Sequence, residues 1–291
     1  MNIVTGAGAV GQWLVAHPLV DKIAFTGSSA TGTAIARAAA ERHARVSLEL
    51  GGKSPNIVFD DANLDDAVNG AVSGIFAATG QTCIAGSRLL LQDSIYDAFV
   101  EKLLALARTA RMGDPMQPDT QVGPITTPPQ YRKVLEYIDI ARNEGARLLL
   151  GGEAVREGPW KDGRFIQPTI FGNVDNAMRI AQEEVFGPVL SIIRFKDEDE
   201  AARIANDVRF GLGAGVWTRD IGRSLRMAER IQSGTVWVNT YRLVSYLMPF
   251  GGYKDSGLGR ESGIDAIREF QQVKSVVINA GAPVGNPFVM R

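Results

Sequence analysis

The sequence predicts an α/β fold with a mostly parallel sheet, because short apolar runs alternate with segments of helical spacing along most of its 291 residues. Runs such as Ile23–Thr26 and Leu89–Leu91 have the length and composition of buried strands. From Ile95 to Leu106, apolar residues recur three and four positions apart, as in a helix. With 45% hydrophobic and 22% charged residues, the chain has the composition of a globular protein.

The first fifty residues contain two predicted strands separated by a helix. Ile23–Thr26 is the first strand, and Ser28 or Ser29 is a suitable N-cap for a helix that runs to about His43. Val46–Leu50 is the second strand. This order predicts a parallel pair of strands joined by a crossover helix.

The middle of the chain continues the alternation. Asp60, Asp61 and Asn63 precede a predicted helix that ends near Phe76. The proline-rich stretch 114–129 is expected to be a loop. The later predicted elements are the helix Gln130–Asn143, which ends before Gly145, the strands Arg147–Leu150, Val189–Phe195, Ala214–Thr218 and Thr235–Val238, and the helices Glu198–Asn206 and Ile221–Ile231.

The C-terminal region is predicted to contain a glycine-rich return segment and a last strand. Phe250–Gly263 is the glycine-rich part, and Val273–Ile278 has the composition of a strand with no helix after it. A strand without a neighbour in its own chain leaves an open edge, which favours pairing with a second copy. We therefore expect a homo-oligomer, either a dimer or a tetramer.

Charge and residue counts argue against several classes of function. The formal net charge of −1 does not favour nucleic acid or an anionic membrane as a partner. No apolar run reaches the roughly 18 residues of a membrane helix. Cys83 is the single cysteine, so no internal disulfide can form, which fits a cytoplasmic protein. His17 and His43 do not combine with Cys83 into a zinc-ligand pattern, and no metal is expected.

Cys83 is a candidate nucleophile. It lies between Gly80 and Gly86, in a stretch that is too polar and too rich in glycine to continue a helix. A thiol on such a loop is accessible, and nearby hydrogen-bond donors favour the thiolate. The alternative is a buried cysteine that acts only as a small hydrophobic side chain.

Glu49 is the candidate base. It comes at the end of the predicted strand Val46–Leu50 and is followed by Gly51 and Gly52. In open α/β sheets, residues at the carboxyl ends of the strands face the crevice where ligands bind. The alternative is a structural salt bridge between Glu49 and Lys53.

Two glycine-containing turns could bind a dinucleotide. Phe25–Gly32 reads as a strand, a tight turn and a helix start, and backbone N–H groups at such a helix start bind phosphate. Gly6–Gly11 matches G-x-G-x-x-G, but no acidic residue at the end of a second strand follows it at the usual distance. We therefore expect the pyrophosphate at 25–32.

Five segments resemble, in the same order, the motifs of the aldehyde dehydrogenase superfamily. They are Phe25–Gly32, Leu48–Pro55, Gly80–Arg88, Glu183–Val189 and Pro249–Glu261. The resemblance covers essentially the whole chain. It implies an aldehyde dehydrogenase-like catalytic domain with a partial dinucleotide-binding domain before it: residues 1–50 would belong to the coenzyme-binding domain, 51–254 to the catalytic domain, and 255–291 to a C-terminal segment with the oligomerisation strand.

The resemblance also implies the chemistry. Cys83 would attack an aldehyde to form a thiohemiacetal, hydride would pass to NAD or NADP, and Glu49 would activate the water that hydrolyses the resulting thioester. A carboxylic acid would be the product. A thiol hydrolase that uses Cys83 and Glu49 is a different possibility, which the lack of a suitable histidine argues against.

The cofactor residues follow from the same resemblance. Those implied to bind the pyrophosphate end or to line the site are Gly27, Ser28, Ser29, Gly32 and Leu50. Glu184 would hold the nicotinamide ribose, although it could be a surface charge, and Phe186 would lie beside the nicotinamide, although it could be a core residue. Gln130 and Lys133 would make lesser cofactor contacts. Asn239 would shape the wall of the site, 242–248 would border the substrate entrance, and Glu261 would join a proton relay or pair with Arg260.

Members of that family are longer than this chain. The remaining part is expected to carry an oxyanion-hole asparagine and the residues that bind the adenine-side ribose. We therefore expect the 291-residue chain by itself to bind NAD(P) weakly and to have little or no aldehyde dehydrogenase activity. An inactive truncated remnant that retains the catalytic-domain fold is the alternative to an active dehydrogenase.

Overall fold

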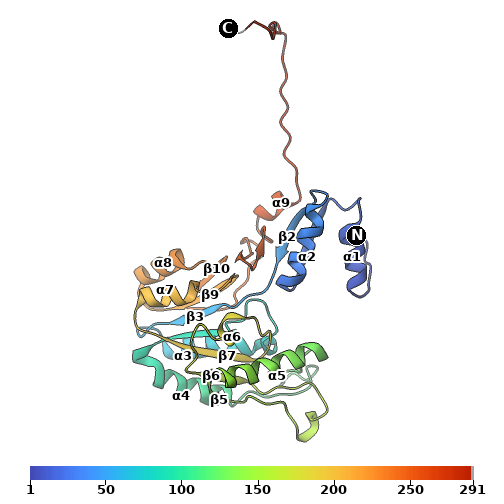
Figure 1. Cartoon of the computed structure of the whole chain (residues 1–291). Helices are drawn as coiled ribbons and strands as arrows, with labels where there is room; N and C mark the ends of the chain where they lie inside the picture. The colour runs from blue at the N-terminus through green and yellow to red at the C-terminus, as the bar shows by residue number, and fades with distance from the viewer. Residues whose placement is uncertain (290–291) are drawn as a thin grey trace.

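The computed structural model describes residues 1–289 and contains a seven-stranded sheet as its largest element (Figure 1). From one edge to the other, its strands are β10 (Thr235–Val238), β9 (Gly213–Trp217), β3 (Pro55–Val58), β4 (Arg88–Gln92), β7 (Val189–Phe195), β6 (Thr169–Gly172) and β5 (Arg147–Leu150). All neighbours are parallel except the edge strand β5, which is antiparallel to β6. The predicted α/β fold with a mostly parallel sheet is confirmed.

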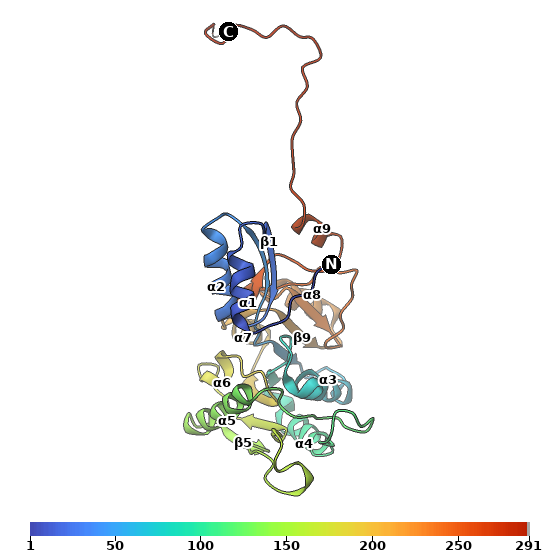
Figure 2. The ribbon, with the colours of Figure 1, turned by 90° about the vertical axis from the view of Figure 1, so that its right-hand side faces the viewer.

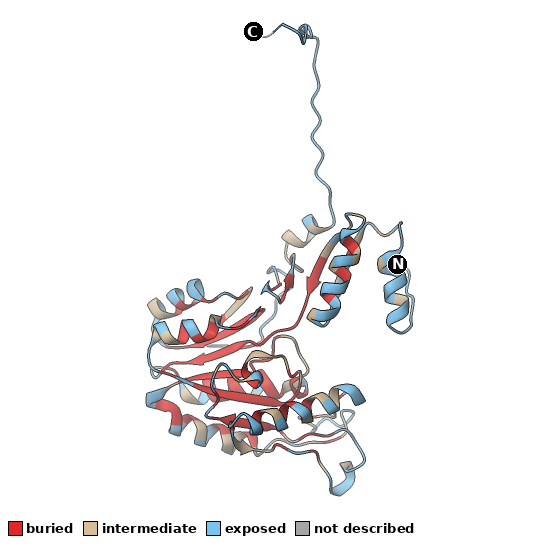
Figure 3. Ribbon diagram, viewed as in Figure 1, coloured by how far each residue is buried: buried red, intermediate tan, exposed pale blue. Residues whose placement is uncertain are grey.

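Helices cover both faces of this sheet (Figure 3). The helices are α3 (Leu64–Phe76) and α4 (Tyr96–Ala107) on one face, and α5 (Pro128–Asn143), α6 (Arg179–Gln182), α7 (Glu198–Asn206) and α8 (Ile221–Arg230) on the other. Successive side chains of a strand point to opposite faces. Ile57 of β3 accordingly packs with α5–α8, and Val58 packs with α3 and α4.

A second, three-stranded sheet holds the N-terminal part of the chain (Figure 2). Its order is β1 (Lys22–Thr26), β2 (Arg45–Glu49), β12 (Gly257–Leu258), with β1 and β2 parallel. The helix α2 (Ser29–Ala40) buries Ile35 and Ala39 against Leu48 of β2. The helix α1 (Gly8–Ala16) has no buried residue.

Short elements complete the described chain. They are η1 (Ala77–Gly80), η2 (Asp93–Ile95), η3 (Gly158–Trp160), the strands β8 (Phe210–Gly211) and β11 (Tyr253–Lys254), which pair with each other, and α9 (Asp265–Glu269). The pairing of β12 with β2 places part of the segment after residue 254 in the same sheet as the first fifty residues. The domain boundaries at 50 and 254 stay a prediction.

Polar side chains cap several of the helices, and two of these caps, Ser28 and Asn63, are among the positions the sequence indicates. The side chain of Asn63 accepts a hydrogen bond from the N–H of Asp65 at 3.2 Å, and Asp197 accepts one from Glu200 at 2.9 Å. Ser28 caps α2 by accepting from Thr31 at 3.3 Å. These bonds satisfy N–H groups that have no partner within the helix.

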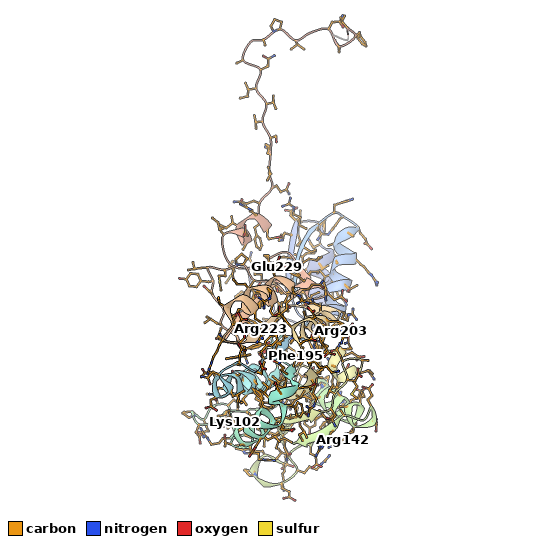
Figure 4. The ribbon with its side chains drawn as sticks, turned by 90° about the vertical axis from the view of Figure 1, so that its left-hand side faces the viewer. Lys102, Arg142, Phe195, Arg203, Arg223 and Glu229 are labelled. Carbon is orange, nitrogen blue, oxygen red and sulfur yellow. The ribbon has the colours of Figure 1, made fainter. Side chains whose placement is uncertain are left out.

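An aromatic cluster joins β3, β7 and α8. The ring of Phe59 lies edge-on to that of Phe195 with centroids 5.2 Å apart. The guanidinium of Arg223 lies 4.5 Å from the centroid of Phe59, and Figure 4 labels Arg223 and Phe195 in this part of the core. The contacts hold α8 against the sheet.

The buried side chain of Arg88 connects three parts of the chain. Its guanidinium donates to the carbonyls of Lys53 at 2.9 Å, Ile204 at 2.8 Å and Ala205 at 2.8 Å, and to Oδ1 of Asn176 at 3.0 Å. Arg88 is fully shielded from solvent. The β2–β3 connection, the end of α7 and the start of β4 are thereby fixed to one another.

The structure differs from the sequence predictions at both ends. Val273–Ile278 is extended but pairs with no strand, and its side chains are exposed, so the prediction of a strand there is wrong for the single chain. No sheet edge of the same chain lies beside it (Figure 1). Near the N-terminus, Gly6–Gly11 does not follow a strand but leads into α1, which the sequence analysis missed along with β3 and β6.

No helix within the described residues is both long and apolar enough to cross a membrane.

We expect Arg88→Met to lower the free energy of unfolding by about 3–5 kcal/mol, because buried carbonyls lose their donors. Urea denaturation followed by circular dichroism measures the change. Arg156→Met is the control, since Arg156 is exposed. Equal stability of the two variants would contradict the structural role of Arg88.

Candidate active site

Glu49 is the last residue of β2 and lies between two neighbouring strands. It pairs with Thr26 of β1 and Gly257 of β12. Its side chain is buried, and Oε2 has no hydrogen-bond partner in the described part of the chain. A Cβ on Gly251 would come within 2.9 Å of Oε1, so this carboxyl group is tightly enclosed.

Burial raises the pKa of Glu49 to about 8. The carboxylate of Glu261 acts in the same direction, and the guanidinium of Arg260 opposes it. Glu49 forms no ion pair with Lys53 among the described residues, so the salt bridge considered as an alternative is absent. A carboxyl group with this pKa is suited to exchange protons near neutral pH.

Cys83 lies in the loop between η1 and β4, as predicted. The backbone enters this loop through three consecutive residues with positive φ: Ala78 at 52°, Thr79 at 57° and Gly80 at 67°. A Cβ on Gly80 would lie 2.1 Å from the carbonyl oxygen of Gly187, and one on Gly52 would lie 2.4 Å from that of Cys83. Glycine at these two positions therefore lets the Cys83 loop pack against two other segments.

The thiol of Cys83 is half-buried, which raises its pKa. The negative charge of Glu184 raises the pKa further, backbone N–H groups including that of Ile84 lower it, and Glu49 raises it. Nearby donors were expected to favour the thiolate, but burial raises the pKa of the thiol by more than these donors lower it. The thiol needs a base to give up its proton near neutral pH.

The side chain of Glu184 contacts Gly51 and Gly52, the two residues of the connection that follows Glu49 and Leu50. Its Oε1 accepts a hydrogen bond from the N–H of Gly52 at 3.1 Å. A Cβ on Gly51 would lie 2.6 Å from Oε2 of Glu184. Burial raises the pKa of Glu184, while the Gly52 N–H and the cations Lys133 and Lys53 oppose the rise. Glu184 is thus not the surface charge considered as an alternative.

A cavity of about 500 Å³ is lined by both Cys83 and Glu184. Its lining includes the predicted site residues Gly27, Ser28, Leu50, Cys83, Glu184, Phe186, Gln130 and Lys133. Thr26, Gly51, Gln81 and Thr82 also line it, and the sequence analysis missed them although each is next to or within one of its motifs. Glu49 does not line the cavity.

Two of the predicted cofactor residues lie elsewhere. Ser29 and Gly32 line a separate cavity of about 470 Å³ beside α2. A Cβ on Gly32 would lie 2.5 Å from Cδ2 of Leu50, so this glycine lets α2 approach the second strand. Ser29 donates through Oγ to the carbonyl of Asp255 at 3.3 Å.

Asn239 and Ser256 organise the backbone around the site. Asn239 exchanges hydrogen bonds with the backbone of Thr218, at 3.0 and 2.9 Å, rather than lining the cavity. Ser256 is fully buried and donates to the carbonyl of Gly51 at 2.7 Å, while its backbone carbonyl accepts from Leu50 at 2.9 Å. Ser256 was missed, although it lies in the last of the five motifs.

Within residues 1–289, no group of three His, Cys, Asp or Glu side chains comes together as a possible metal site.

Comparison with known proteins agrees with the fold. A family model described as "Aldehyde dehydrogenase family" matches residues 1–276. The chain therefore belongs to the aldehyde dehydrogenase family. It is 46% identical over 287 residues to a betaine aldehyde dehydrogenase of Brucella anthropi, a match that covers 99% of this chain and 59% of that relative. The chain spans about three fifths of the length of such relatives.

Solved structures give the same result. An NAD-dependent aldehyde dehydrogenase from Sinorhizobium meliloti is 44% identical, with a TM-score of 0.94 over 98% of this chain and 56% of that one. A betaine aldehyde dehydrogenase from Staphylococcus aureus in complex with NAD+ is 40% identical, with a TM-score of 0.95 over 98% of this chain and 57% of that one.

We expect the stability of the protein to fall with rising pH because of Glu49. Between its ordinary pKa of 4.5 and its folded pKa of about 8, the folded state keeps a proton that the unfolded state has lost. Stability therefore decreases through this window, by about 1.4 kcal/mol between pH ~7 and ~9 from this group alone.

Glu49→Gln is expected to remove this part of the pH dependence. Urea denaturation at the two pH values measures it for the wild type and the variant. Glu136→Gln, at an exposed position, is the matched control and should keep the wild-type pH dependence. An unchanged dependence in Glu49→Gln would show that the carboxyl group is not shielded as described.

Proposed function

We propose that this chain carries the catalytic residues for NAD(P)-dependent oxidation of an aldehyde to a carboxylic acid. The observation that carries the proposal is the cavity that brings Cys83 together with Glu184, Phe186 and the turn before α2. The buried carboxyl group of Glu49 lies close enough to raise the pKa of the thiol. These observations support a site with a candidate nucleophile in a cofactor-sized cavity and a candidate base close to that nucleophile.

The residues around the cavity fit a dinucleotide. Gly27 and Ser28 precede the N-terminus of the 12-residue helix α2, where backbone N–H groups favour phosphate. The carboxylate of Glu184, oriented by the N–H of Gly52, is placed to accept from ribose hydroxyl groups. Phe186 supplies an aromatic ring beside them. When bound, NAD(P) accepts the hydride released by the oxidation.

The protein residues carry the covalent steps. As Cys83 loses its proton, Sγ bonds to the aldehyde carbon, and the carbonyl oxygen gains a proton to give a thiohemiacetal. Loss of a hydride and a proton converts this adduct into a thioester. Glu49 then takes a proton from water, the water oxygen bonds to the thioester carbon, and the C–S bond breaks. The carboxylic acid leaves and the thiol is restored.

The relatives guide the choice of substrate and cofactor for a first test. Several are named betaine aldehyde dehydrogenases, and one solved relative holds NAD+. We propose betaine aldehyde, or another small aldehyde, and NAD as the first pair to assay. The participation of Glu261 in a proton relay is supported by its effect on the pKa of Glu49. A cytoplasmic location and a homo-oligomer stay predictions.

We expect Cys83→Ala to abolish aldehyde oxidation, since no second thiol exists in the chain. NADH formation with a panel of aldehydes measures it. Oxidation at the wild-type rate in Cys83→Ala would end the proposal. If the wild type is also inactive while it is folded, the alternative of an inactive chain that retains the fold is favoured.

We expect Glu49→Gln to slow hydrolysis of the thioester more than its formation, because the base acts on water after the hydride has left. Stopped-flow absorbance should then show a rapid burst of NADH followed by a steady rate lowered by about 10²–10⁴-fold. The wild-type steady rate should also rise with pH through the pKa of about 8. If burst and steady rate fall together, Glu49 acts earlier in the reaction.

A further inference from the structure

The turn from Glu184 to Pro188 is held in an unfavourable backbone conformation. Phe186 has φ of 57°, a left-handed value that a bulky non-glycine residue rarely adopts. Such a conformation persists only where the surrounding structure imposes it. The interactions that impose it here are therefore of functional interest, because Glu184 and Phe186 both line the cavity.

One side chain fixes the carbonyl groups on either side of this strained point. Gln130, in the first turn of α5, donates from Nε2 to the carbonyl of Val185 at 2.7 Å and to that of Phe186 at 2.8 Å. An amide nitrogen has two hydrogens to donate. Both are used on the backbone of the turn, so they are not free for a ligand.

The turn also contacts the two segments next to the reacting groups, which are the Cys83 loop and the connection after Glu49. The carbonyl of Gly187 faces Gly80, where a Cβ would lie only 2.1 Å away. The carboxylate of Glu184 faces Gly51, where a Cβ would lie 2.6 Å away, and it accepts from the N–H of Gly52. A displacement of the turn would change the packing of the Cys83 loop and of the connection after Glu49.

We propose that Gln130 is a positioning residue whose side-chain amide clamps the strained turn at Val185–Phe186 and thereby sets the Cys83 loop. This differs from a role as a cofactor contact. It rests on the proposed function only in taking Cys83 as the reacting thiol. The physical claim concerns the packing of that thiol and can be tested without any turnover.

The single cysteine makes the test direct. In Gln130→Met the side chain keeps its length but loses both donors. We expect iodoacetamide to alkylate Cys83 on the order of tenfold faster, because two carbonyls lose their donors and the loop opens more often. Mass spectrometry follows the modification of the 291-residue chain. Gln130→Glu, which also lacks the donors, should behave likewise and is the second variant should Gln130→Met fail to fold.

Arg132→Gln is the matched control, since Arg132 is exposed in the same turn of the helix. Its alkylation rate should equal that of the wild type. Hydrogen exchange in a peptide covering 183–190 should be faster in Gln130→Met and unchanged in the control. A general loss of stability would instead accelerate exchange throughout the sheet.

A double-mutant cycle tests whether Gln130 acts by holding the strained conformation of Phe186 or only by general packing. Glycine adopts positive φ without strain, so the turn should need the clamp less in Phe186→Gly. Gln130→Met should then accelerate alkylation less in that background than in the wild type. Equal acceleration in both backgrounds, or wild-type alkylation in Gln130→Met, would overturn the proposal. Failure of aldehyde oxidation would overturn the proposed function but would leave these rates unaffected.

Discussion

The arrangement of the site depends on the buried guanidinium group of Arg88. A charged group without solvent is stable only when its hydrogens find acceptors, and here those acceptors are backbone carbonyls of separate segments and the side-chain oxygen of Asn176. One of them belongs to Lys53, in the connection that carries the chain from the small sheet to the large one. Glu49 comes directly before this connection. Gly52, which is part of the connection, donates a hydrogen bond to Glu184. By fixing the connection, Arg88 therefore helps to position both carboxyl groups.

Burial also shifts the pKa values of ionisable groups near the site. Lys53 is buried, its Nζ has no hydrogen-bond partner in the described chain, and burial lowers its pKa to about 7, with Arg88 acting in the same direction. Burial raises the pKa of both Glu49 and Glu184. Desolvation therefore favours the neutral form of acid and amine alike. Glu49 and Lys53 can therefore each gain or lose a proton near neutral pH.

The sequence was sufficient to predict the α/β class and five of the seven strands of the main sheet, all except β3 and β6, and it pointed to Glu49 and Cys83 as candidates for catalysis. Glu49 at a strand end and Cys83 in a glycine-flanked loop depend on local patterns, which are visible in the residues themselves. Phe186 was predicted only through the family resemblance, and its left-handed backbone could not be foreseen because a phenylalanine ordinarily avoids it. Ser29 and Gly32 were assigned to the cofactor because they match the pyrophosphate turn of the family. In the structure Ser29 donates to the carbonyl of Asp255 and Gly32 packs against Leu50, and their contact with a cofactor stays a prediction.

Contacts between distant segments account for what the sequence did not predict. The bonds of Ser256 join positions about two hundred residues apart, and no periodicity encodes such a pairing. The extended residues 273–278 have a composition typical of a strand, but a strand also needs a neighbour whose free N–H and C=O groups are in register. Composition alone cannot state whether that neighbour is present.

The three left-handed residues before Gln81 also restrict how this loop can change over evolution. Gly80 has no room for a side chain, so any replacement there must move Gly187 as well. Ala78 is exposed, and its conformation is one that asparagine adopts more readily than alanine. Drift at position 78 is therefore open toward asparagine or glycine, while position 80 can vary only together with the turn it touches. Positions 78 and 80 of the same loop are thus expected to tolerate substitution to very different degrees.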